Sequence, residues 1–486
     1  MTSPSDAVPH AAANDSDPGA FPPPPAPFGH SSGLQPQPVP RRSKKPLVAT
    51  IVVAVLVLAG VGVFIATRSD DDEPSSAVAA SALVRVNYDD EQLEVLDTTG
   101  DVVDRIDIPD VSAANLVTGL PGRVIFDSSR DGEIVIVNVA DGSTETYDVP
   151  EGLTLSRTLG PDSAHVVLDS VGGGDVVVID LETGATTSAV EEVADSDSMF
   201  LLARAFATGT TYNDVGGTAQ SLVVPDVGSD LWLVPGFIIY LDGDRSIAVE
   251  PNDDASTVTI DARAKEIGSV DVDGQVRGGV LTGDDTALVV TAEGDIVKVD
   301  VGKGEVSVVD SFADPITYAI ALSADRIFVA GDGSTSYLLD ATGKTVAEFE
   351  AVEDDDGNKR EVALGPNGAR PSSRCFVTQA GPEPGPTAAA VALRDQRTGE
   401  ILAEFDGSAS VLDTPDGCTA VSAFDRAADI ALDGDLREFD GYDTVLAVSS
   451  DLKRVVVHGE DGLALIDVAS GDETDLDNDQ YAFVTS

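Results

Sequence analysis

The sequence contains few basic and few aromatic residues, and both shortages limit its possible functions. Its 29 lysine and arginine residues are outnumbered by 85 aspartate and glutamate residues, which gives a formal charge of −56. A surface with this charge repels the phosphates of nucleic acids, so no nucleic-acid partner is expected. Aromatic residues make up only 5% of the chain. Together with abundant valine, alanine, glycine and aspartate, this favours many short strands and tight turns over a helical bundle.

Cysteine and histidine are also scarce. Cysteine occurs only at Cys375 and Cys418, too few for a disulfide-dense scaffold or a structural zinc site but enough for one disulfide. Outside the N-terminal region the only histidines are His165 and His458. Both lie beside apolar strand residues and are interpreted as packing or rim residues. Because no G-x-S-x-G elbow, H-E-x-x-H pair or phosphate-binding loop occurs, we assign no catalytic and no cofactor-binding residue.

The N-terminal part predicts a tail, a membrane anchor and a stalk. Residues 1–45 are rich in proline, alanine, serine and glycine, which predicts a disordered tail; a docking site for a proline-reading domain is the alternative. Residues 46–67 contain an uncharged apolar run at 47–66, about 30 Å long as a helix, which predicts a transmembrane span. An acidic stalk at 68–82 follows.

The charges that flank the span predict its orientation. Four basic residues precede it, so the tail should be cytoplasmic and the remainder extracytoplasmic, in a single-pass protein of the cell membrane. A cleaved signal peptide is the rival interpretation. It would have a shorter apolar region with a small-residue cleavage site directly behind it. Here the triplet at 77–79 lies beyond the acidic cluster, which favours an uncleaved anchor.

Residues 83–486 repeat a ten-residue phrase that is clearest at 175–184. Its apolar run predicts a buried strand, Asp180 can fold back onto backbone N–H groups, and Gly184 can adopt a positive φ. Aspartates or an asparagine recur at intervals mostly near 40 residues. These anchors are Asp97, Asn138, Asp180, Asp226, Asp261, Asp300, Asp340, Asp395, Asp433 and Asp467. Such a repeat of short strands is typical of four-stranded β-propeller blades, with the anchors as turn-formers rather than catalysts.

The pattern also predicts the order of strands and the closure of the ring. In the unit at 277–309, strands are predicted at 280–281, 287–291, 295–300 and 305–309. Residues 481–486 have the pattern of an innermost strand, and residues 82–86 that of a second strand. We therefore expect the last strand to complete the first blade, which removes an exposed sheet edge. Seven to ten blades are expected, with one or two irregular units near 200–260 or 410–440.

The phrases at 175–184 and 462–471 resemble YVTN-type and quinoprotein-like propeller repeats, in which V-x-V-I-D-x-x-T-G recurs. The resemblance covers most of residues 83–486 and implies an all-β propeller, but no particular activity. Quinoprotein repeats carry a tryptophan in each docking motif, whereas Trp232 is the only tryptophan here, so pyrroloquinoline quinone is not expected. The tail–anchor–propeller layout is similar to envelope proteins of high-GC Gram-positive bacteria.

Two acidic loops could suit a hard cation. The stronger candidate calcium ligands are Asp354, Asp356, Asn358 and Glu361. They lack the full twelve-residue ligand spacing, and a solvated blade insertion is the favoured alternative. The run at 475–479 places carboxylates at alternate positions and is a weaker candidate.

The two cysteines occupy matching places in successive units. Equivalent positions on neighbouring blades could bring Cys375 and Cys418 within the Cα separation of about 7 Å that a disulfide requires. Two reduced buried thiols are the alternative, and the expected extracytoplasmic location favours the disulfide. On the chain-entropy model it would contribute about 3–4 kcal/mol.

Two main classes of function remain open. The sequence favours a non-catalytic binding or scaffold module of the cell envelope, whose propeller binds a protein, peptide or glycan. The alternative is an extracytoplasmic hydrolase, lactonase- or glycosidase-like, that uses carboxylates in the central funnel; only analogy of fold supports it. A receptor that signals through the proline-rich tail is a third hypothesis and would need a cytoplasmic partner.

Overall fold

All residues that can be described belong to one compact unit, Ser76–Ser486. The computed structural model describes residues 82–88, 90–97, 99–108, 115–118, 122–128, 132–155, 165–169, 176–181, 185–188, 200–206, 209–214, 220–225, 232–252, 254–263, 265–332, 335–353, 359–369, 373–380, 390–405, 408–412, 414, 417–423, 428–477 and 479–484. The predicted tail (1–45), transmembrane helix (46–67) and nearly all of the stalk (68–82) therefore lie outside the described residues. Within the described part, no helix has the length and apolarity needed to span a bilayer.

The described residues form ten four-stranded antiparallel sheets and one two-stranded hairpin. We number the sheets as blades along the chain. Blades 1 to 3 contain β1 (Ala82–Asn87), β2 (Gln92–Leu96), β3 (Val102–Asp107) and β42 (Gln480–Val484); β4 (Asn115–Thr118), β5 (Arg123–Ser128), β6 (Glu133–Asn138) and β7 (Thr144–Asp148); and β8 (Thr154–Leu155), β9 (His165–Asp169), β10 (Val177–Asp180) and β11 (Thr186–Ser188).

Blades 4 to 6 contain β12 (Phe200–Phe206), β13 (Gly209–Asp214), β14 (Gln220–Pro225) and β15 (Trp232–Pro235); β16 (Phe237–Asp242), β17 (Arg245–Pro251), β18 (Ala255–Ala262) and β19 (Lys265–Asp273); and β20 (Val276–Leu281), β21 (Thr286–Thr291), β22 (Asp295–Asp300) and β23 (Glu305–Ser311). Blade 7 contains β24 (Ile316–Ser323), β25 (Arg326–Gly331), β26 (Thr335–Asp340) and β27 (Thr345–Glu350), and the hairpin β28 (Val352–Glu353) and β29 (Lys359–Arg360) follows it.

Blades 8 to 10 contain β30 (Val362–Ala369), β31 (Cys375–Ala380), β32 (Ala390–Asp395) and β33 (Ile401–Phe405); β34 (Ser408–Leu412), β35 (Thr419–Ala423), β36 (Ala428–Leu432) and β37 (Asp435–Phe439); and β38 (Tyr442–Val448), β39 (Arg454–Gly459), β40 (Gly462–Asp467) and β41 (Glu473–Leu476). In each sheet every strand pairs with the next along the chain, except that β42 pairs with β1.

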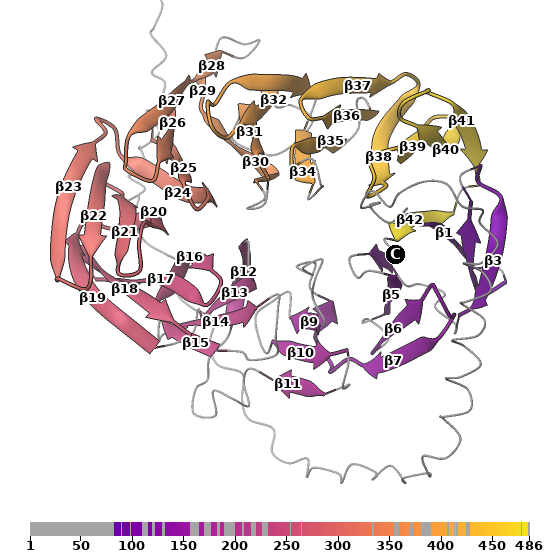
Figure 1. Cartoon of the computed structure of the whole chain (residues 1–486), viewed down its shortest axis with the longest axis horizontal. Coiled ribbons are helices and arrows are strands. Elements are labelled where there is room, and N and C mark those ends of the chain that lie inside the picture. The colour runs from indigo at the N-terminus through magenta and orange to yellow at the C-terminus, as the bar shows by residue number, and fades with distance from the viewer. Residues whose placement is uncertain are drawn as a thin grey trace, which may run out of the picture. The chain divides into compact units, whose positions relative to one another are not determined.

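The blades are arranged around a ring, with the first strand of blades 2 to 10 toward the centre and the fourth strand on the outside (Figure 1). This arrangement is a β-propeller, as the repeat predicted. The ten blades found in the described residues reach the upper end of the expected seven to ten. The four strands predicted in the unit at 277–309 are confirmed as β20 to β23, with boundaries that differ by a few residues.

The expectation of irregular units near 200–260 or 410–440 was wrong. Blades 4, 5 and 9 each have four strands, but blades 5 and 9 use a different turn. In blade 9, Leu432 pairs with Asp435, so only Asp433 and Gly434 form the turn, with φ of 49° and 92°. Two-residue hairpin turns of this kind require positive φ values and have no place for the longer repeat phrase. The sequence signal is therefore weak although the blades are complete.

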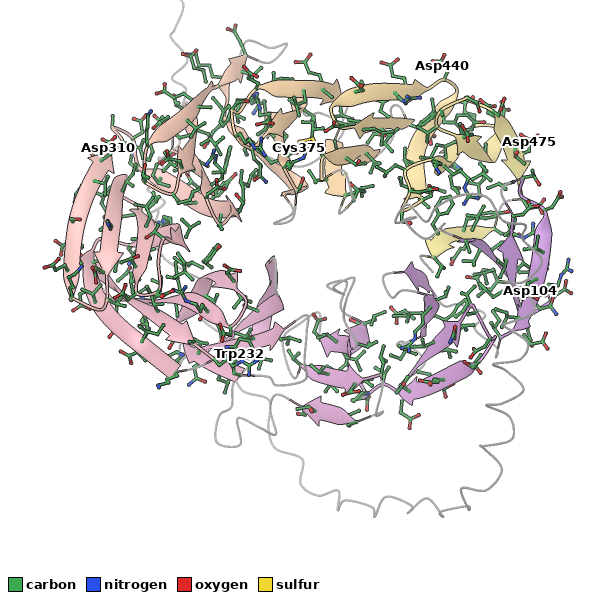
Figure 2. The ribbon with its side chains drawn as sticks, viewed as in Figure 1. Asp104, Trp232, Asp310, Cys375, Asp440 and Asp475 are labelled. Carbon is green, nitrogen blue, oxygen red and sulfur yellow. A yellow bond between two sulfur atoms is a disulfide. The ribbon has the colours of Figure 1, made fainter. Side chains whose placement is uncertain are left out.

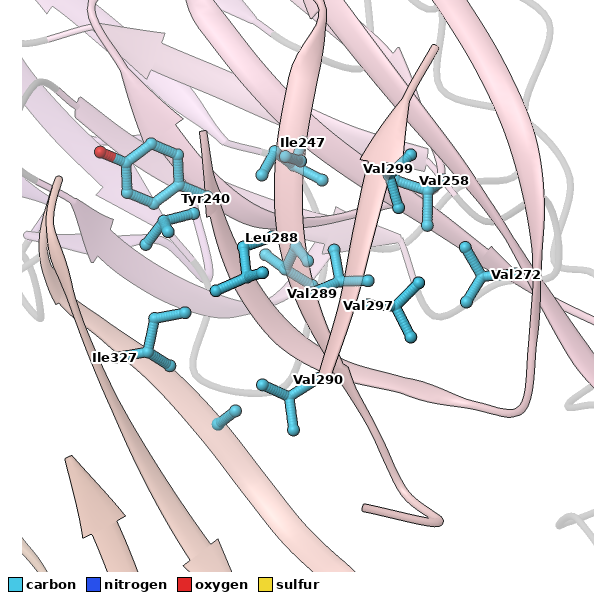
Figure 3. Close-up of a cluster of buried hydrophobic side chains, with 14 of the residues drawn as sticks. Tyr240, Ile247, Val258, Val272, Leu288, Val289, Val290, Val297, Val299 and Ile327 are labelled. Carbon is cyan, nitrogen blue, oxygen red and sulfur yellow. The ribbon is translucent and has the colours of Figure 1, made fainter. Parts of the chain in front are cut away.

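The core lies between the blades. Apolar side chains from the two faces of each sheet pack against both neighbours, and buried clusters join every successive pair of blades, including blade 10 with blade 1. The largest cluster extends through blades 5, 6 and 7 (Figure 3). Val289 and Val297 within it are 0% and 2% exposed. Burial of apolar area at about 25 cal/mol per Å² is the main force that holds such blades together.

Blade 1 closes the ring as expected from the sequence. The C-terminal strand β42 is its innermost strand and pairs with β1, with Tyr481 opposite Arg85. Arg85 in turn lies opposite Glu94 of β2 and hydrogen-bonds to it through Nε at 2.8 Å. Arg85 also forms an ion pair with Asp477, in the segment between β41 and β42, at 2.5 Å. Blade 1 therefore combines the two ends of the propeller through backbone pairing and a charged contact.

Candidate functional site

The recurrent aspartates lie at the ends of third strands and form turns. Oδ1 of Asp467 accepts hydrogen bonds from the backbone N–H groups of Ala469 at 3.0 Å and Ser470 at 2.8 Å. These bonds, above all the one from the Ser470 backbone, lower the pKa of Asp467, and Gly471 completes the turn with a φ of 74°. Equivalent bonds are made by Asp97, Asp340 and Asp395. The turn-forming role is confirmed for these copies, whereas the turn after Asp180 lies outside the described residues.

Asp261 has the same place in the repeat but a different environment. In blade 5, Ala262 pairs with Lys265, and the N–H of Arg263, two residues after Asp261, donates to the carbonyl of Asp244 instead of to the Asp261 carboxylate. Its side chain is 1% exposed, and Oδ2 has no hydrogen-bond partner. Burial, with a smaller contribution from the charge of Glu266, raises the pKa of Asp261 to about 6 from an ordinary value of 3.8. The prediction that this copy forms a turn was therefore wrong.

Asp261 lies on the face of blade 5 that packs against blade 4. It pairs with Ser246, two residues from Ala248, which joins the cluster between the two blades. On the facing side of blade 4, Trp232 packs against the same cluster, and its Nε1, like Ser246 Oγ, is buried without a hydrogen-bond partner. This interface thus contains a buried carboxylate among polar groups that do not bond to it.

Most of the candidate calcium ligands cannot be placed. Asp354, Asp356 and Asn358 lie outside the described residues, in the connection between β28 and β29. Glu361 follows β29, and burial together with the charge of Asp332 raises its pKa. In the weaker candidate run at 475–479, Asp477 forms the ion pair with Arg85. Among the described residues, no three His, Cys, Asp or Glu side chains are grouped so as to hold a metal ion.

The two histidines occupy second strands of their blades. His165 begins β9 and pairs with Asp180. His458 lies on β39, where Nδ1 is 3.2 Å from Oδ1 of Asp443 on the innermost strand β38. The side chains of His458 and Asp443 are 47% and 41% exposed. His458 is therefore a rim residue with a carboxylate partner, rather than a packed core residue.

The predicted disulfide is confirmed. Cys375 at the start of β31 and Cys418 just before β35 are bonded, with Cα atoms 5.1 Å apart. Both residues are 1% exposed and lie in the apolar cluster between blades 8 and 9. Figure 2 shows Cys375 in this part of the ring. The bond therefore links two adjacent blades, as their matching places in the repeat indicated.

The outer strand of blade 6 is unusual, and sequence reasoning did not single it out. All seven residues of β23 are exposed. Among the other outer strands of the described part, each contains at least one residue that is partly or fully buried. Val306, Val308 and Val309 expose 40%, 61% and 48% of their surfaces. We call the segment Glu305–Ser311 the β23 edge. It is the last strand of its sheet, so no further strand pairs with it in the described part of the chain.

The two faces of the β23 edge differ. Ile296 and Val309 lie on the side of blade 7, because a Cβ placed on Gly343 of that blade would contact both. Val297 follows Ile296 on β22, so it and its partner Val308 face the opposite side, toward blade 5. Val306, two residues from Val308, shares that face. The blade 5 face of the edge is therefore apolar.

The blade 7 face is mixed and mainly acidic. It presents Glu305, which pairs with Asp300, and Asp310, which pairs with Ile296. Figure 2 shows Asp310 on the outside of the ring. The cations on this face are Lys298, opposite Ser307, and Lys303, which forms an ion pair with Asp300. An apolar stripe and carboxylates thus lie on opposite faces of one exposed strand.

No family model and no curated protein matches the chain. Solved structures similar to it include the dihydro-heme d1 dehydrogenase NirN in complex with DHE. The two sequences are 13% identical, the TM-score is 0.38, and the match covers 86% of this chain and 77% of that one. A eukaryotic initiation factor is 11% identical, with a TM-score of 0.44 and coverage of 84% and 98%. Apo AztD from Citrobacter koseri is 11% identical, with a TM-score of 0.29 and the same coverage.

Similarity at this level concerns the fold alone. The assignment as a β-propeller rests instead on the order of strands in each sheet and on the packing between blades. The closer relationship to YVTN-type or quinoprotein-like repeats, and to envelope proteins of high-GC Gram-positive bacteria, stays a prediction.

Proposed function

We propose that the protein is a membrane-tethered, extracytoplasmic β-propeller that acts as a non-catalytic binding module of the cell envelope. The observation that carries the proposal is the β23 edge. Large apolar side chains that are exposed together on a soluble surface are typical of interaction sites. Among the described residues, half of the exposed large apolar side chains lie on β23 and on the adjacent outer strand β19: Ile267, Val306, Val308 and Val309.

The tether and the charge support the same role. A single-span anchor at 46–67 would hold the propeller at the outer surface of the membrane, where it could meet a fixed partner. The charge of −56 would keep copies of the chain apart and attract partners of opposite charge. Both conditions suit a binding module more than they suit a soluble enzyme.

Photo-crosslinking in intact cells tests the proposal. A benzoylphenylalanine residue is placed at Ser307, in the centre of the β23 edge, and for comparison at Thr146, an exposed residue of the outer strand β7 of blade 2. We expect a discrete crosslinked partner from Ser307 and none from Thr146. The same background from both positions would refute the β23 edge as a binding surface.

One contact favours the alternative, an extracytoplasmic hydrolase. His458 and Asp443 form an accessible pair at 3.2 Å, and Asp443 belongs to an innermost strand. A histidine that hydrogen-bonds to a carboxylate can act as a general base. The test is turnover of a γ-lactone and of 4-nitrophenyl glycosides by the full-length protein. Turnover that is lost in His458→Gln would establish this alternative.

A further inference from the structure

We propose, on the basis of the binding function above, that the partner of the β23 edge is an extended peptide segment that adds to blade 6 as a fifth strand and carries alternating apolar and basic residues. The segment would pair with β23 through backbone hydrogen bonds. Its apolar side chains would lie beside Val306 and Val308, and its basic side chains beside Glu305 and Asp310.

The exposure of β23 on both faces favours an added strand over a partner that rests on one face. Val308 and Val309 face opposite sides of the sheet, and both are about half exposed, at 61% and 48%. A globular surface laid against the blade 5 face would leave Val309 in water. Side chains of a β-strand point alternately to the two faces of its sheet, so an added strand covers both.

The composition of the β23 edge does not protect it from strand addition. Outer strands of soluble proteins are commonly blunted by lysine, proline, inward-pointing charges or a β-bulge. β23 has a bulge at Val309, but its residues Glu305 to Val308 pair with β22 in unbroken register. The four central residues, Val306 to Val309, are uncharged and include no proline. In contrast, the equally exposed Val103 on β3, at 62%, is followed by Asp104 and Arg105. The outer edge of blade 6 can therefore accept an added strand, whereas the outer edge of blade 1 is protected by charged residues.

Charge selects the composition of the partner. Both carboxylates of the β23 edge lie on the blade 7 face, so basic residues are favoured at alternate positions of the added strand. A segment with carboxylates at the same alternate positions would be repelled.

The test uses the full-length protein in detergent micelles and fluorescein-labelled peptides of eight residues. The probe alternates valine with lysine, and the control peptide alternates valine with glutamate. Two further probes carry N-methyl groups on every second residue, in one frame or the other. Because alternate N–H groups of a strand point to the same side, only one frame blocks pairing with β23. Fluorescence anisotropy measures the affinity of each peptide.

We expect the lysine probe to bind, the glutamate peptide not to bind, and one N-methyl frame to lose affinity by at least about tenfold more than the other. Val308→Asp should weaken the probe at least about tenfold, while the matched variant Val103→Asp should change its affinity less than about twofold. Equal losses in the two N-methyl frames, or equal effects of the two variants, would overturn the proposal. Near-UV circular dichroism confirms that both variants are folded.

Failure of this inference can be told from failure of the proposed function. If Ser307 is crosslinked to a partner in cells but the two N-methyl frames lose affinity equally, the β23 edge binds a partner by side chains alone, and only strand addition is refuted. If Ser307 captures no partner and the lysine probe does not bind, both proposals are refuted.

Discussion

Replacement of Asp261 by asparagine should stabilise the protein more at pH 8 than at acidic pH. The pKa of Asp261 is about 6 in the folded protein and 3.8 as an ordinary aspartate. Because the folded pKa is the higher one, the charged form is disfavoured by folding. The free-energy cost of folding with a charged Asp261 is absent below the ordinary pKa, grows as the pH rises from the ordinary to the folded pKa, and is fully present above the folded pKa. Asparagine has nearly the same shape and no charge, so it removes this pH-dependent cost.

The magnitude follows from the difference between the two pKa values. At about 1.36 kcal/mol per pKa unit, the full cost is about 3 kcal/mol above pH 7. At pH 4.5, just above the pI of about 4.1, the same two values leave a cost of about 1 kcal/mol. The difference in unfolding free energy between Asp261→Asn and the parent should therefore change by about 2 kcal/mol between pH 4.5 and pH 8. Any pH-independent effect of the amide cancels in this comparison.

Urea denaturation monitored by tryptophan fluorescence is the appropriate assay. Trp232 is the only tryptophan in the chain and packs in the cluster between blades 4 and 5, the interface that Asp261 faces. The control is Asp467→Asn, whose carboxyl has a lowered pKa in the folded protein. Because that carboxyl titrates below its ordinary pKa of 3.8, the stability of this variant relative to the parent should hardly change between pH 4.5 and pH 8. If the difference in unfolding free energy between Asp261→Asn and the parent is the same at both pH values, the raised pKa of Asp261 is refuted.

Four further outcomes are expected. Non-reducing tryptic mapping should link the peptides of Cys375 and Cys418, and serine at both positions should lower the unfolding free energy by about 4 kcal/mol; free alkylation of both thiols in unreduced protein would contradict this. Glu94 is buried and bonds to both Arg85 and Arg105, so Arg85→Met should lower the unfolding free energy in urea denaturation by up to about 3–5 kcal/mol; a neutral result would show that Arg105 suffices. Gly343→Ala should lower the melting temperature, since φ is 88° and the new Cβ would lie 2.9 Å from Ile296; an unchanged melting temperature would show that the turn relaxes. The protein should resist alkaline carbonate extraction until residues 46–67 are deleted, and release of the intact protein would exclude the anchor.

The sequence was sufficient to predict those features that depend on local patterns. Unbroken apolar runs and glycine-containing turns predicted the strands of blade 6, and the matching places of the two cysteines in the repeat predicted their bond. Ring closure also followed, because residues 480–484 lack the partners that an innermost strand needs unless they pair with β1. In each case a short-range rule of strand or turn chemistry was enough.

The remaining features depend on what surrounds each residue in space. Asp261 was indistinguishable from Asp467 in the repeat, and only the shorter turn of blade 5 explains why its carboxylate is buried instead of bonded to N–H groups. The valines of β23 look like those of any strand. Their place on the outer fourth strand followed from the repeat. Their exposure also depends on the extra residue at Val309, which interrupts the pairing with β22 and is not encoded by periodicity.

The pairing of β42 with β1 makes completion of blade 1 depend on the order of synthesis. During translation, β1 is made early, but its inner partner is made only after roughly 390 more residues, which takes about 20–80 s at about 5–20 residues per second. For all of that time the inner edge of β1 has no strand of its own chain to pair with. Blade 1 is therefore the place where the nascent protein most needs a chaperone, and where strands of two copies made side by side could be exchanged.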